Sequence, residues 1–177
     1  MRRRSRMVKC VVVLLAGTSL LASAGTASAA GCKNQYLAPK KSNVETYERA
    51  VRCLLNRERT TRGLKALDSH WALNKAAERH SRSMVRGHYF DHFGSDGSSP
   101  KSRMKKAGYS GKGYGENITY GTGGYATPRN VMQRWMASSG HRANILAGTY
   151  DDLGVGIAIG TPKGSGGVTV TTTFGAR

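Results

Sequence analysis

The sequence LGVGIAIGTPKGSGGVTVTTTFG, residues 153–175, decides the fold class. Its two flanking runs, 153–160 and 167–175, are rich in Val, Ile and Thr, whose branched side chains favour extended strands. The segment 161–166 between them combines Pro, Gly and Ser, which are typical of turns. The stretch therefore predicts an antiparallel hairpin at the end of the chain.

Upstream of this hairpin the apolar residues recur at three- and four-residue steps, which indicates helices. A first helix is expected to start at a capping box formed by Ser42 and Glu45 and to stop near Gly63. A second helix is expected from about Ser69, with His80 packed on its apolar stripe. Helices followed by antiparallel strands predict the α+β class.

Two further helices are indicated by Ser99-Pro100 and Thr127-Pro128, because each pair joins an N-cap residue to a first-turn proline. The segment between them, 108–125, is rich in Gly and Tyr and is expected to be mostly loop, with a short strand over 117–120. We expect the following aromatic residues to lie in the core: Trp71, Trp135 and Phe174.

The first 29 residues have the three parts of a secretory signal peptide: a basic start, an apolar run and Ala27-Ser28-Ala29 at the end. The apolar run is short of the roughly 20 residues that a membrane span needs, although a retained anchor helix is an alternative. We therefore divide the chain into a signal peptide (1–29), an N-terminal tail (30–41) and one domain (42–177), with no transmembrane segment after cleavage. This division predicts a secreted, extracellular protein.

The chain is strongly basic. It holds 28 Lys and Arg, of which five lie in the predicted leader, so 23 remain against 10 Asp and Glu and the formal charge falls from +18 to +13. Such a charge attracts anionic partners outside the cell, either cell-wall polymers or lipid surfaces, and predicts association with the cell envelope. No arginine-rich arm, zinc-finger spacing or RNA-binding aromatic motif is present in the sequence, which argues against specific nucleic-acid binding. We expect a monomer.

After removal of the leader two cysteines remain, Cys32 and Cys53. Two cysteines in an exported chain suggest one disulfide, which would tie the tail to the first helix. Closing a loop of this size stabilises a fold by roughly 3 kcal/mol on the chain-entropy model. The alternative is that Cys32 is lipidated, because Ala29-Ala30-Gly31-Cys32 is similar to a lipoprotein signal.

Several blocks appear together in one order along the chain: CLLNRERTTRGLKAL (53–67), HSRSMVRGHYFDH (80–92), GYGENITYG (113–121), VMQRWMASSGHRANIL (131–146) and YDDLGVGIAI (150–159). In this order the chain resembles the bacterial branch of the CAP superfamily, which contains cysteine-rich secretory proteins, antigen 5 and plant pathogenesis-related proteins. The resemblance runs from about residue 42 to 174. It implies a three-layer α-β-α sandwich with a small antiparallel sheet and a cleft on one side.

In this family the cleft often presents two histidines and two acidic residues. Carried over by motif, these positions are His92 in YFDH, Glu116 in GEN and His141 in GHRAN, whereas Ser138 stands where relatives have the second acid. Beside Glu116, the Asn117 side chain is expected to tether backbone. The predicted binding cleft therefore comprises His92, Glu116, Ser138 and His141.

Two imidazoles and one carboxylate suit a divalent metal such as Zn²⁺, with His92, His141 and also Glu116 as ligands. Hydrolysis would further need a general base, and Ser138 removes the obvious one. We therefore favour a non-catalytic binding module over a metal-dependent, peptidase-like hydrolase or a lipid or sterol carrier. A serine hydrolase using Ser138 or Ser139 lacks the GxSxG elbow. A metal-free network of His and Glu is the remaining alternative.

Overall fold

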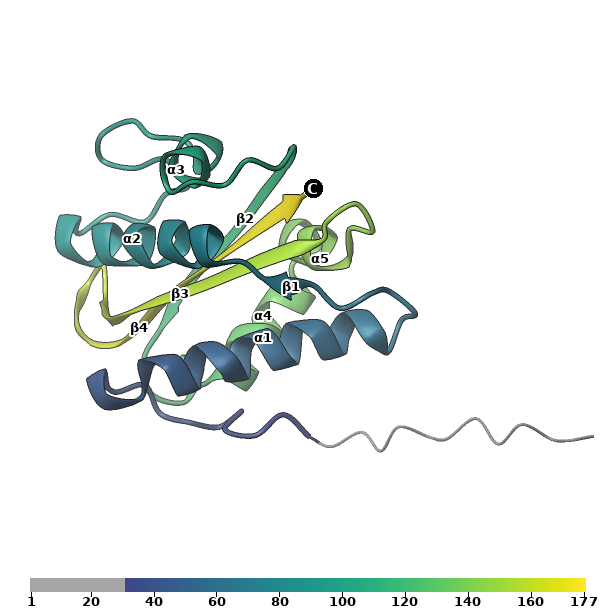
Figure 1. The fold of residues 1–177 in the computed structure, drawn as a ribbon. Coiled ribbons are helices and arrows are strands. Elements are labelled where there is room, and N and C mark those ends of the chain that lie inside the picture. Colours follow the sequence, from purple (N-terminus) through teal and green to yellow (C-terminus); the bar gives the residue numbers. More distant parts are fainter. Residues whose placement is uncertain (1–30) are drawn as a thin grey trace, which may run out of the picture. The chain divides into compact units, whose positions relative to one another are not determined.

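The computed structural model describes residues 31–177, except for the side chain of Ser165, so the predicted signal peptide lies outside the described residues. The described chain is an α+β fold in which a sheet separates two helical layers (Figure 1). The helices are α1 (Val44–Thr60), α2 (Trp71–Gly87), α3 (Pro100–Lys106), α4 (Pro128–Ala137) and α5 (Ser139–Leu146). The strands are β1 (Asp68–Ser69), β2 (Gly113–Gly121), β3 (Asp152–Thr161) and β4 (Gly164–Ala176).

The sheet has the order β1-β3-β4-β2. The predicted hairpin is its centre, because β3 and β4 pair antiparallel with Ile157 opposite Val170. Strand β2 adds to the other edge of β4, also antiparallel. The two-residue β1 pairs parallel to β3. The sheet is therefore mixed at this edge, whereas the sequence predicted an antiparallel sheet.

The alternation along β4 explains the two helical layers. Val168, Val170 and Phe174 are fully buried in the apolar core that also receives α1 and α4. On the other face the Ser81 hydroxyl of α2 donates to the Thr171 hydroxyl at 2.8 Å, and the Thr173 hydroxyl donates to the Leu73 carbonyl at 3.1 Å. The threonines thus bond a helix that lies close to the sheet, while the apolar face forms the main core.

Glycines in β3 allow α2 to approach so closely. A Cβ at Gly154 would collide with the backbone of Leu73, and one at Gly156 would collide with the backbone of Ala77 and Glu78. The alternating glycines of LGVGIAIG are therefore a packing requirement, since any side chain there would push α2 off the sheet.

The predicted N-cap residues were confirmed at two helices, and the predicted capping box was wrong at a third. The Ser99 hydroxyl accepts from the Ser102 amide at the start of α3, and the Thr127 hydroxyl accepts from the Asn130 amide at the start of α4. The capping box at Ser42 does not form, because Lys41–Asn43 make a 3₁₀ turn and Asn43 is the residue before α1.

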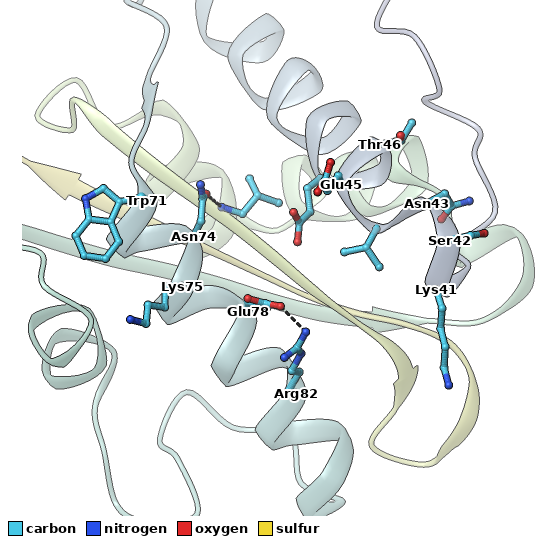
Figure 2. A pocket seen from close by; sticks show the side chains of 13 residues that line it. Lys41, Ser42, Asn43, Glu45, Thr46, Trp71, Asn74, Lys75, Glu78 and Arg82 are labelled. Carbon is cyan, nitrogen blue, oxygen red and sulfur yellow. Dashed lines mark hydrogen bonds and ion pairs between the residues drawn. The ribbon is translucent and has the colours of Figure 1, made fainter.

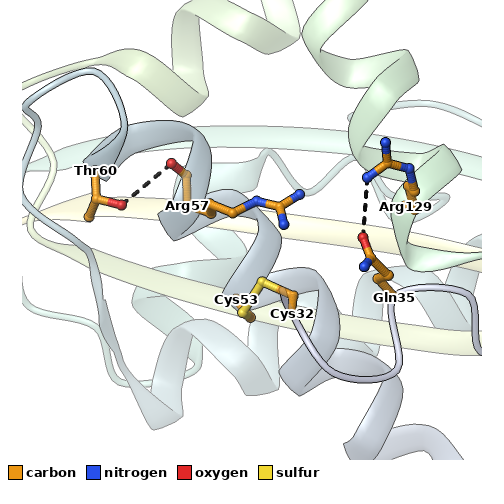
Figure 3. Close-up of a disulfide and its surroundings, with 6 residues drawn as sticks. All are labelled: Cys32, Gln35, Cys53, Arg57, Thr60 and Arg129. Carbon is orange, nitrogen blue, oxygen red and sulfur yellow. Dashed lines mark hydrogen bonds between the residues drawn. A yellow bond between two sulfur atoms is a disulfide. The ribbon is translucent and has the colours of Figure 1, made fainter. Parts of the chain in front are cut away.

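The predicted Cys32–Cys53 disulfide is present and joins the segment before α1 to the middle of that helix, with 5.8 Å between the two Cα atoms (Figure 3). Cys32 is itself buried in the main core. Close to the disulfide, the Arg129 side chain of α4 donates to the Gln35 side-chain oxygen at 3.2 Å. Within residues 31–177, no helix is both long and apolar enough to cross a membrane.

Candidate functional site

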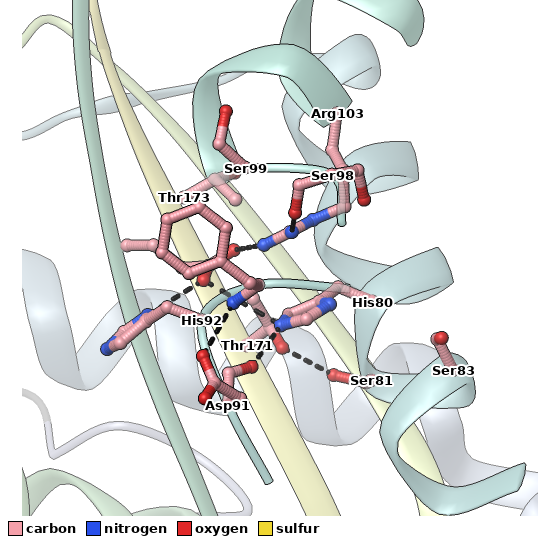
Figure 4. A network of polar contacts seen from close by, with 12 residues as sticks. His80, Ser81, Ser83, Asp91, His92, Ser98, Ser99, Arg103, Thr171 and Thr173 are labelled. Carbon is pink, nitrogen blue, oxygen red and sulfur yellow. Dashed lines mark hydrogen bonds and ion pairs between the residues drawn. The ribbon is translucent and has the colours of Figure 1, made fainter. Parts of the chain in front are cut away.

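Glu116, in the middle of β2, is the centre of the candidate site. Its side chain is 2% exposed, and its carboxylate lies between the His92 and Arg103 side chains, which are both labelled in Figure 4. The His92 imidazole donates from Nδ1 to Glu116 Oε1 at 2.9 Å. The Arg103 guanidinium donates to Glu116 Oε2 at 2.7 Å. Both carboxylate oxygens are therefore engaged by side chains.

His92 comes from the loop between α2 and α3, and its side chain is 47% exposed. The hydrogen bond to Glu116 raises the pKa of His92, because it favours the protonated ring more than burial disfavours it. His92 and Glu116 line a surface pocket of about 480 Å³ together with Lys101 and Tyr114. The Lys101 ammonium lies 5.4 Å from the centre of the Tyr114 ring, so a lysine also lines this pocket.

Arg103 is a member of the site that the sequence did not reveal. It lies in α3, its side chain is 12% exposed, and it also donates to the Ser98 carbonyl at 2.7 Å. The Ser99-Pro100 helix start places Arg103 in the second turn of α3, facing β2. Only the resemblance to a family pointed to Glu116, and no motif marks its arginine partner.

His80 is packed, as its place on the apolar stripe of α2 predicted, and is 1% exposed. Its Nε2 lies 2.9 Å from the Asp91 carbonyl and 3.8 Å from Glu116 Oε1. A carbonyl can only accept, so the proton of the neutral ring is on Nε2. Burial lowers the pKa of His80 and keeps the ring neutral at neutral pH.

The second predicted histidine, His141, lies in α5, and two asparagines tie its backbone to β2. The Asn117 side chain donates to the His141 carbonyl at 3.0 Å, so this asparagine tethers backbone as expected. The Asn144 side chain donates to the Glu116 carbonyl at 3.1 Å and to Asn117 Oδ1 at 2.9 Å. These bonds hold the start of α5 against the part of β2 that carries Glu116.

The His141 ring packs near Trp135, with 6.3 Å between ring centres. Burial lowers the pKa of His141, and the positive charge on His92 lowers it further. Among the described atoms, His141 Nδ1 is buried and has no hydrogen-bond partner.

Ser138 lies at the junction of α4 and α5, where its carbonyl accepts from the Arg142 amide at 2.9 Å. Across the described chain, no hydrogen bond joins the Ser138 or Ser139 side chain to His92, Glu116 or His141. The structure thus joins His92 directly to Glu116, brings His141 to the same strand, and leaves Ser138 as a helix-junction residue.

The side chains of this site fit only part of the metal site that the family resemblance implies. Residues 31–177 contain no cluster of three or more His, Cys, Asp and Glu side chains placed to hold a metal ion. Glu116 is already shared by Arg103 and His92, so it does not fit the role of a zinc ligand. The two imidazoles remain as chemically suitable donors, with Glu116 holding the orientation of His92.

A different and larger pocket, about 830 Å³, lies between the start of α1 and α2 (Figure 2). None of the predicted site residues lines it. Trp71 is at its edge and is 62% exposed, so the prediction of Trp71 as a core residue was wrong. Trp135 and Phe174 are buried as predicted.

Comparison with known proteins agrees with the family resemblance of the sequence motifs. A sequence model described as the cysteine-rich secretory protein (CAP) family matches residues 53–174. The uncharacterized protein YkwD of Bacillus subtilis is 40% identical over 134 residues, which are 76% of this chain and 51% of YkwD. The chain therefore spans about half the length of this curated relative.

Two solved structures share the fold at low identity. An extracellular protein containing an SCP domain from Bacillus anthracis has a TM-score of 0.63 and 23% identity, over 77% of this chain and 41% of that protein. An outer surface protein of Borrelia burgdorferi has a TM-score of 0.68 and 18% identity, over 80% of this chain and 99% of that protein. At these identities the likeness establishes the fold alone.

Proposed function

The chain belongs to the cysteine-rich secretory protein (CAP) family, and from this premise we propose that it is an exported, non-catalytic module that binds the cell envelope. The binding site is the cleft around His92, Glu116 and His141. Its ligand is an anionic group of a cell-wall polymer.

The observation that carries this proposal is the charge balance around Glu116. One buried carboxylate is held by Arg103 and by His92, whose pKa is raised, and Lys101 lines the same pocket. Arg103 balances the charge of the carboxylate from behind, so Lys101 and a protonated His92 make the pocket positive. A positive, open pocket attracts an anion and gains affinity when His92 is protonated.

Binding is better supported than catalysis by the same geometry. A hydrolase needs a base that can take a proton from water or from a nucleophile. Glu116 is committed to two cationic partners, and Ser138 stands where relatives have a second acid. A hydrolytic mechanism therefore has no supporting contact within the described residues.

Zinc binding remains part of the proposal in a narrower form. The donors would be the His92 and His141 imidazoles, and Glu116 would orient His92 through Nδ1. Zinc would supply a further positive charge for an anionic ligand. Metal analysis of protein purified without chelators or a histidine tag tests this part: stoichiometric zinc that is lost in His92→Gln supports it, and metal-free protein contradicts it.

Export is supported by the basic and apolar leader in the sequence, and by the disulfide, since disulfides persist outside the reducing cytosol. The structural relatives include one described as extracellular and one described as an outer surface protein. Secretion is tested by detecting the protein, shortened by the leader, in the culture fluid or on the cell surface.

The binding proposal is tested by cosedimentation with purified cell walls, prepared with and without their phosphodiester-linked anionic polymers, at increasing salt. We expect binding only to the walls that carry the polymers, weakened by His92→Gln and by Lys101→Gln. Lys112→Gln is the matched control, because Lys112 is exposed and does not line the pocket.

Equal binding to both wall preparations would contradict the proposal, as would equal losses in Lys101→Gln and Lys112→Gln. Vesicles of anionic lipid form a separate arm. Binding to these vesicles without binding to walls would replace the wall polymer by a membrane surface as the partner.

A further inference from the structure

A second pocket, separate from the cleft at His92, lies between α2, α3 and the loop over residues 94–98. Its volume is about 470 Å³, which is within the range of small-molecule sites. Most of its polar lining residues carry a hydroxyl group or a basic side chain, and one of them is a buried histidine. The principal members are Arg79, His80, Ser83, Ser95, Ser98 and Lys106.

The buried imidazole is His80, whose polar contacts all converge on one ring nitrogen (Figure 4). The Asp91 carbonyl fixes the proton of this ring on Nε2. The other nitrogen, Nδ1, is therefore an acceptor. It is buried and has no hydrogen-bond partner among the described protein atoms. Leaving a buried acceptor unpaired is costly, so this atom points to a ligand that donates a hydrogen bond.

Hydroxyl groups also line this pocket. Ser83 Oγ accepts a hydrogen bond from the Tyr89 hydroxyl at 2.8 Å, which leaves its own proton free to donate into the pocket. Ser95 and Ser98 contribute further hydroxyls from the loop. Such a lining matches a ligand with several hydroxyl groups, since each hydroxyl both donates and accepts.

The rim of the pocket is positive. Arg79 and Lys106 are exposed, and within residues 31–177 neither side chain is in an ion pair. Arg103 also lines the pocket, although its guanidinium is bound to Glu116 and Ser98. Asp96 is the one acidic residue of the lining, and its carboxylate accepts from the Ser98 amide at 3.0 Å. Arg79 and Lys106 outnumber Asp96, whose carboxylate interacts with the Lys106 charge, so the rim favours a ligand with a negative group.

From these contacts we propose that the pocket between α2 and α3 is a second binding site, for a small hydroxylated anion. One hydroxyl of the ligand donates to His80 Nδ1, which neighbouring side chains cover until the ligand enters, and its phosphate or carboxylate lies between Arg79 and Lys106. Polyol phosphates and acidic sugars both have this chemistry. This site goes beyond the proposed cleft, from which it is separated by His80 and Arg103.

The test is a titration of ¹⁵N-labelled protein, followed through the imidazole nitrogens in long-range ¹H–¹⁵N spectra. Glycerol 3-phosphate and glucuronate are the probes, and glycerol, glucose and inorganic phosphate are the controls. We expect at least one probe to shift the His80 Nδ1 resonance saturably, to the lower frequency of a nitrogen that accepts a hydrogen bond. The probe that does so identifies the acid group as phosphate or carboxylate.

Neighbouring lysines of α3 provide a matched pair of variants. Lys106 lines the pocket and Lys105 does not, and both are exposed. We expect Lys106→Gln and Arg79→Gln to weaken probe binding by about tenfold or more, as loss of a charge-assisted hydrogen bond does, and Lys105→Gln to leave it within about twofold. All three substitutions are at the surface, so the fold is retained.

Three results would overturn the proposal: no shift at His80 with either probe, an equal shift with neutral glycerol or glucose, or equal weakening by Lys105→Gln and Lys106→Gln. The readout also separates this site from the proposed cleft. A shift at His92 without one at His80 supports the cleft and refutes the second site, and the reverse supports the second site alone.

Discussion

The substitution Glu116→Gln probes the site most deeply, because it removes one negative charge and keeps the shape of the side chain. Glu116 is 2% exposed and its Arg103 partner is 12% exposed, so the pair is shielded from water. A guanidinium nitrogen of Arg103 lies 2.7 Å from Glu116 Oε2. The change leaves the Arg103 charge without its counter-ion in a largely buried place.

Removing one partner of a buried ion pair costs about 3–5 kcal/mol of unfolding free energy. Two contacts should make the cost smaller for Glu116→Gln. The Gln oxygen can still accept from Arg103, and Arg103 keeps its bond to the Ser98 carbonyl. We therefore expect Glu116→Gln to lower the free energy of unfolding by about 2–3 kcal/mol, measured by urea denaturation at neutral pH.

The same variant changes the protonation of His92. The hydrogen bond to Glu116 is the largest cause of the raised pKa of His92, so Glu116→Gln should lower this pKa, as followed by NMR titration. The sign for stability follows from linkage. The raised pKa of His92 stabilises the fold fully below the unfolded pKa of about 6.5, and the stabilisation is lost as pH rises through the folded pKa. Glu116→Gln should therefore lose this stabilisation by protonated His92, and the loss should be seen at acidic pH.

Glu45→Gln is the matched control, since Glu45 is 87% exposed and its pair with Arg49 is 3.5 Å long. We expect this control to change stability by less than about 0.5 kcal/mol. The reasoning is refuted if Glu116→Gln is as mild as the control and the His92 titration curve is unchanged.

Three further predictions concern the elements that support the site. Replacing both Cys32 and Cys53 by Ala should lower the unfolding free energy by roughly 3 kcal/mol, seen in urea melts; an unchanged midpoint would contradict the role of the disulfide. Arg59 is 1% exposed and donates to the Lys65, Ile145 and Ala147 carbonyls, so Arg59→Met should cost about 2–4 kcal/mol, with Arg59→Lys intermediate. If Arg59→Met leaves the urea midpoint unchanged, the end of α5 does not depend on its hydrogen bonds to Arg59. Gly156→Ala should cost about 1–3 kcal/mol because the new methyl group meets the α2 backbone, whereas Gly148→Ala, in open space, should be mild; similar melts for both would refute the close packing.

The sequence predicted those parts of the fold that depend on local chemistry. The hairpin of β3 and β4 was confirmed, because its alternating residues meet two different layers. The N-caps at Ser99 and Thr127 were confirmed because their hydroxyls bond within one helical turn. The three-layer architecture came from the family resemblance and is also confirmed.

Longer-range contacts explain the predictions that were wrong. The segment 108–125 was expected to be mostly loop, but Gly113–Gly121 form β2. Its glycines are needed where other parts of the chain come close: a Cβ at Gly115 would meet the Tyr150 hydroxyl, and one at Gly121 would meet the Tyr125 backbone. Trp71 is the first residue of α2 and lies outside its apolar stripe. It shares the exposed face of the helix with Asn74 and Lys75, which line the same pocket.

At the candidate site, the sequence could name the histidines and Glu116 through family motifs but could not identify their partners. Arg103 reaches Glu116 only because α3 packs against β2, and His80 approaches it only because α2 lies flat on the sheet. Partners of this kind depend on tertiary packing, which no local pattern encodes.

The proposal that most needs testing is that His92 and His141 face one cleft. It is tested most directly by the pKa of His141, measured by NMR in the unaltered protein and in His92→Gln. Because the charge on His92 lowers the pKa of His141, the account predicts a higher value in the variant. An unchanged pKa would mean that the two imidazoles do not sense each other, and the shared cleft would be contradicted.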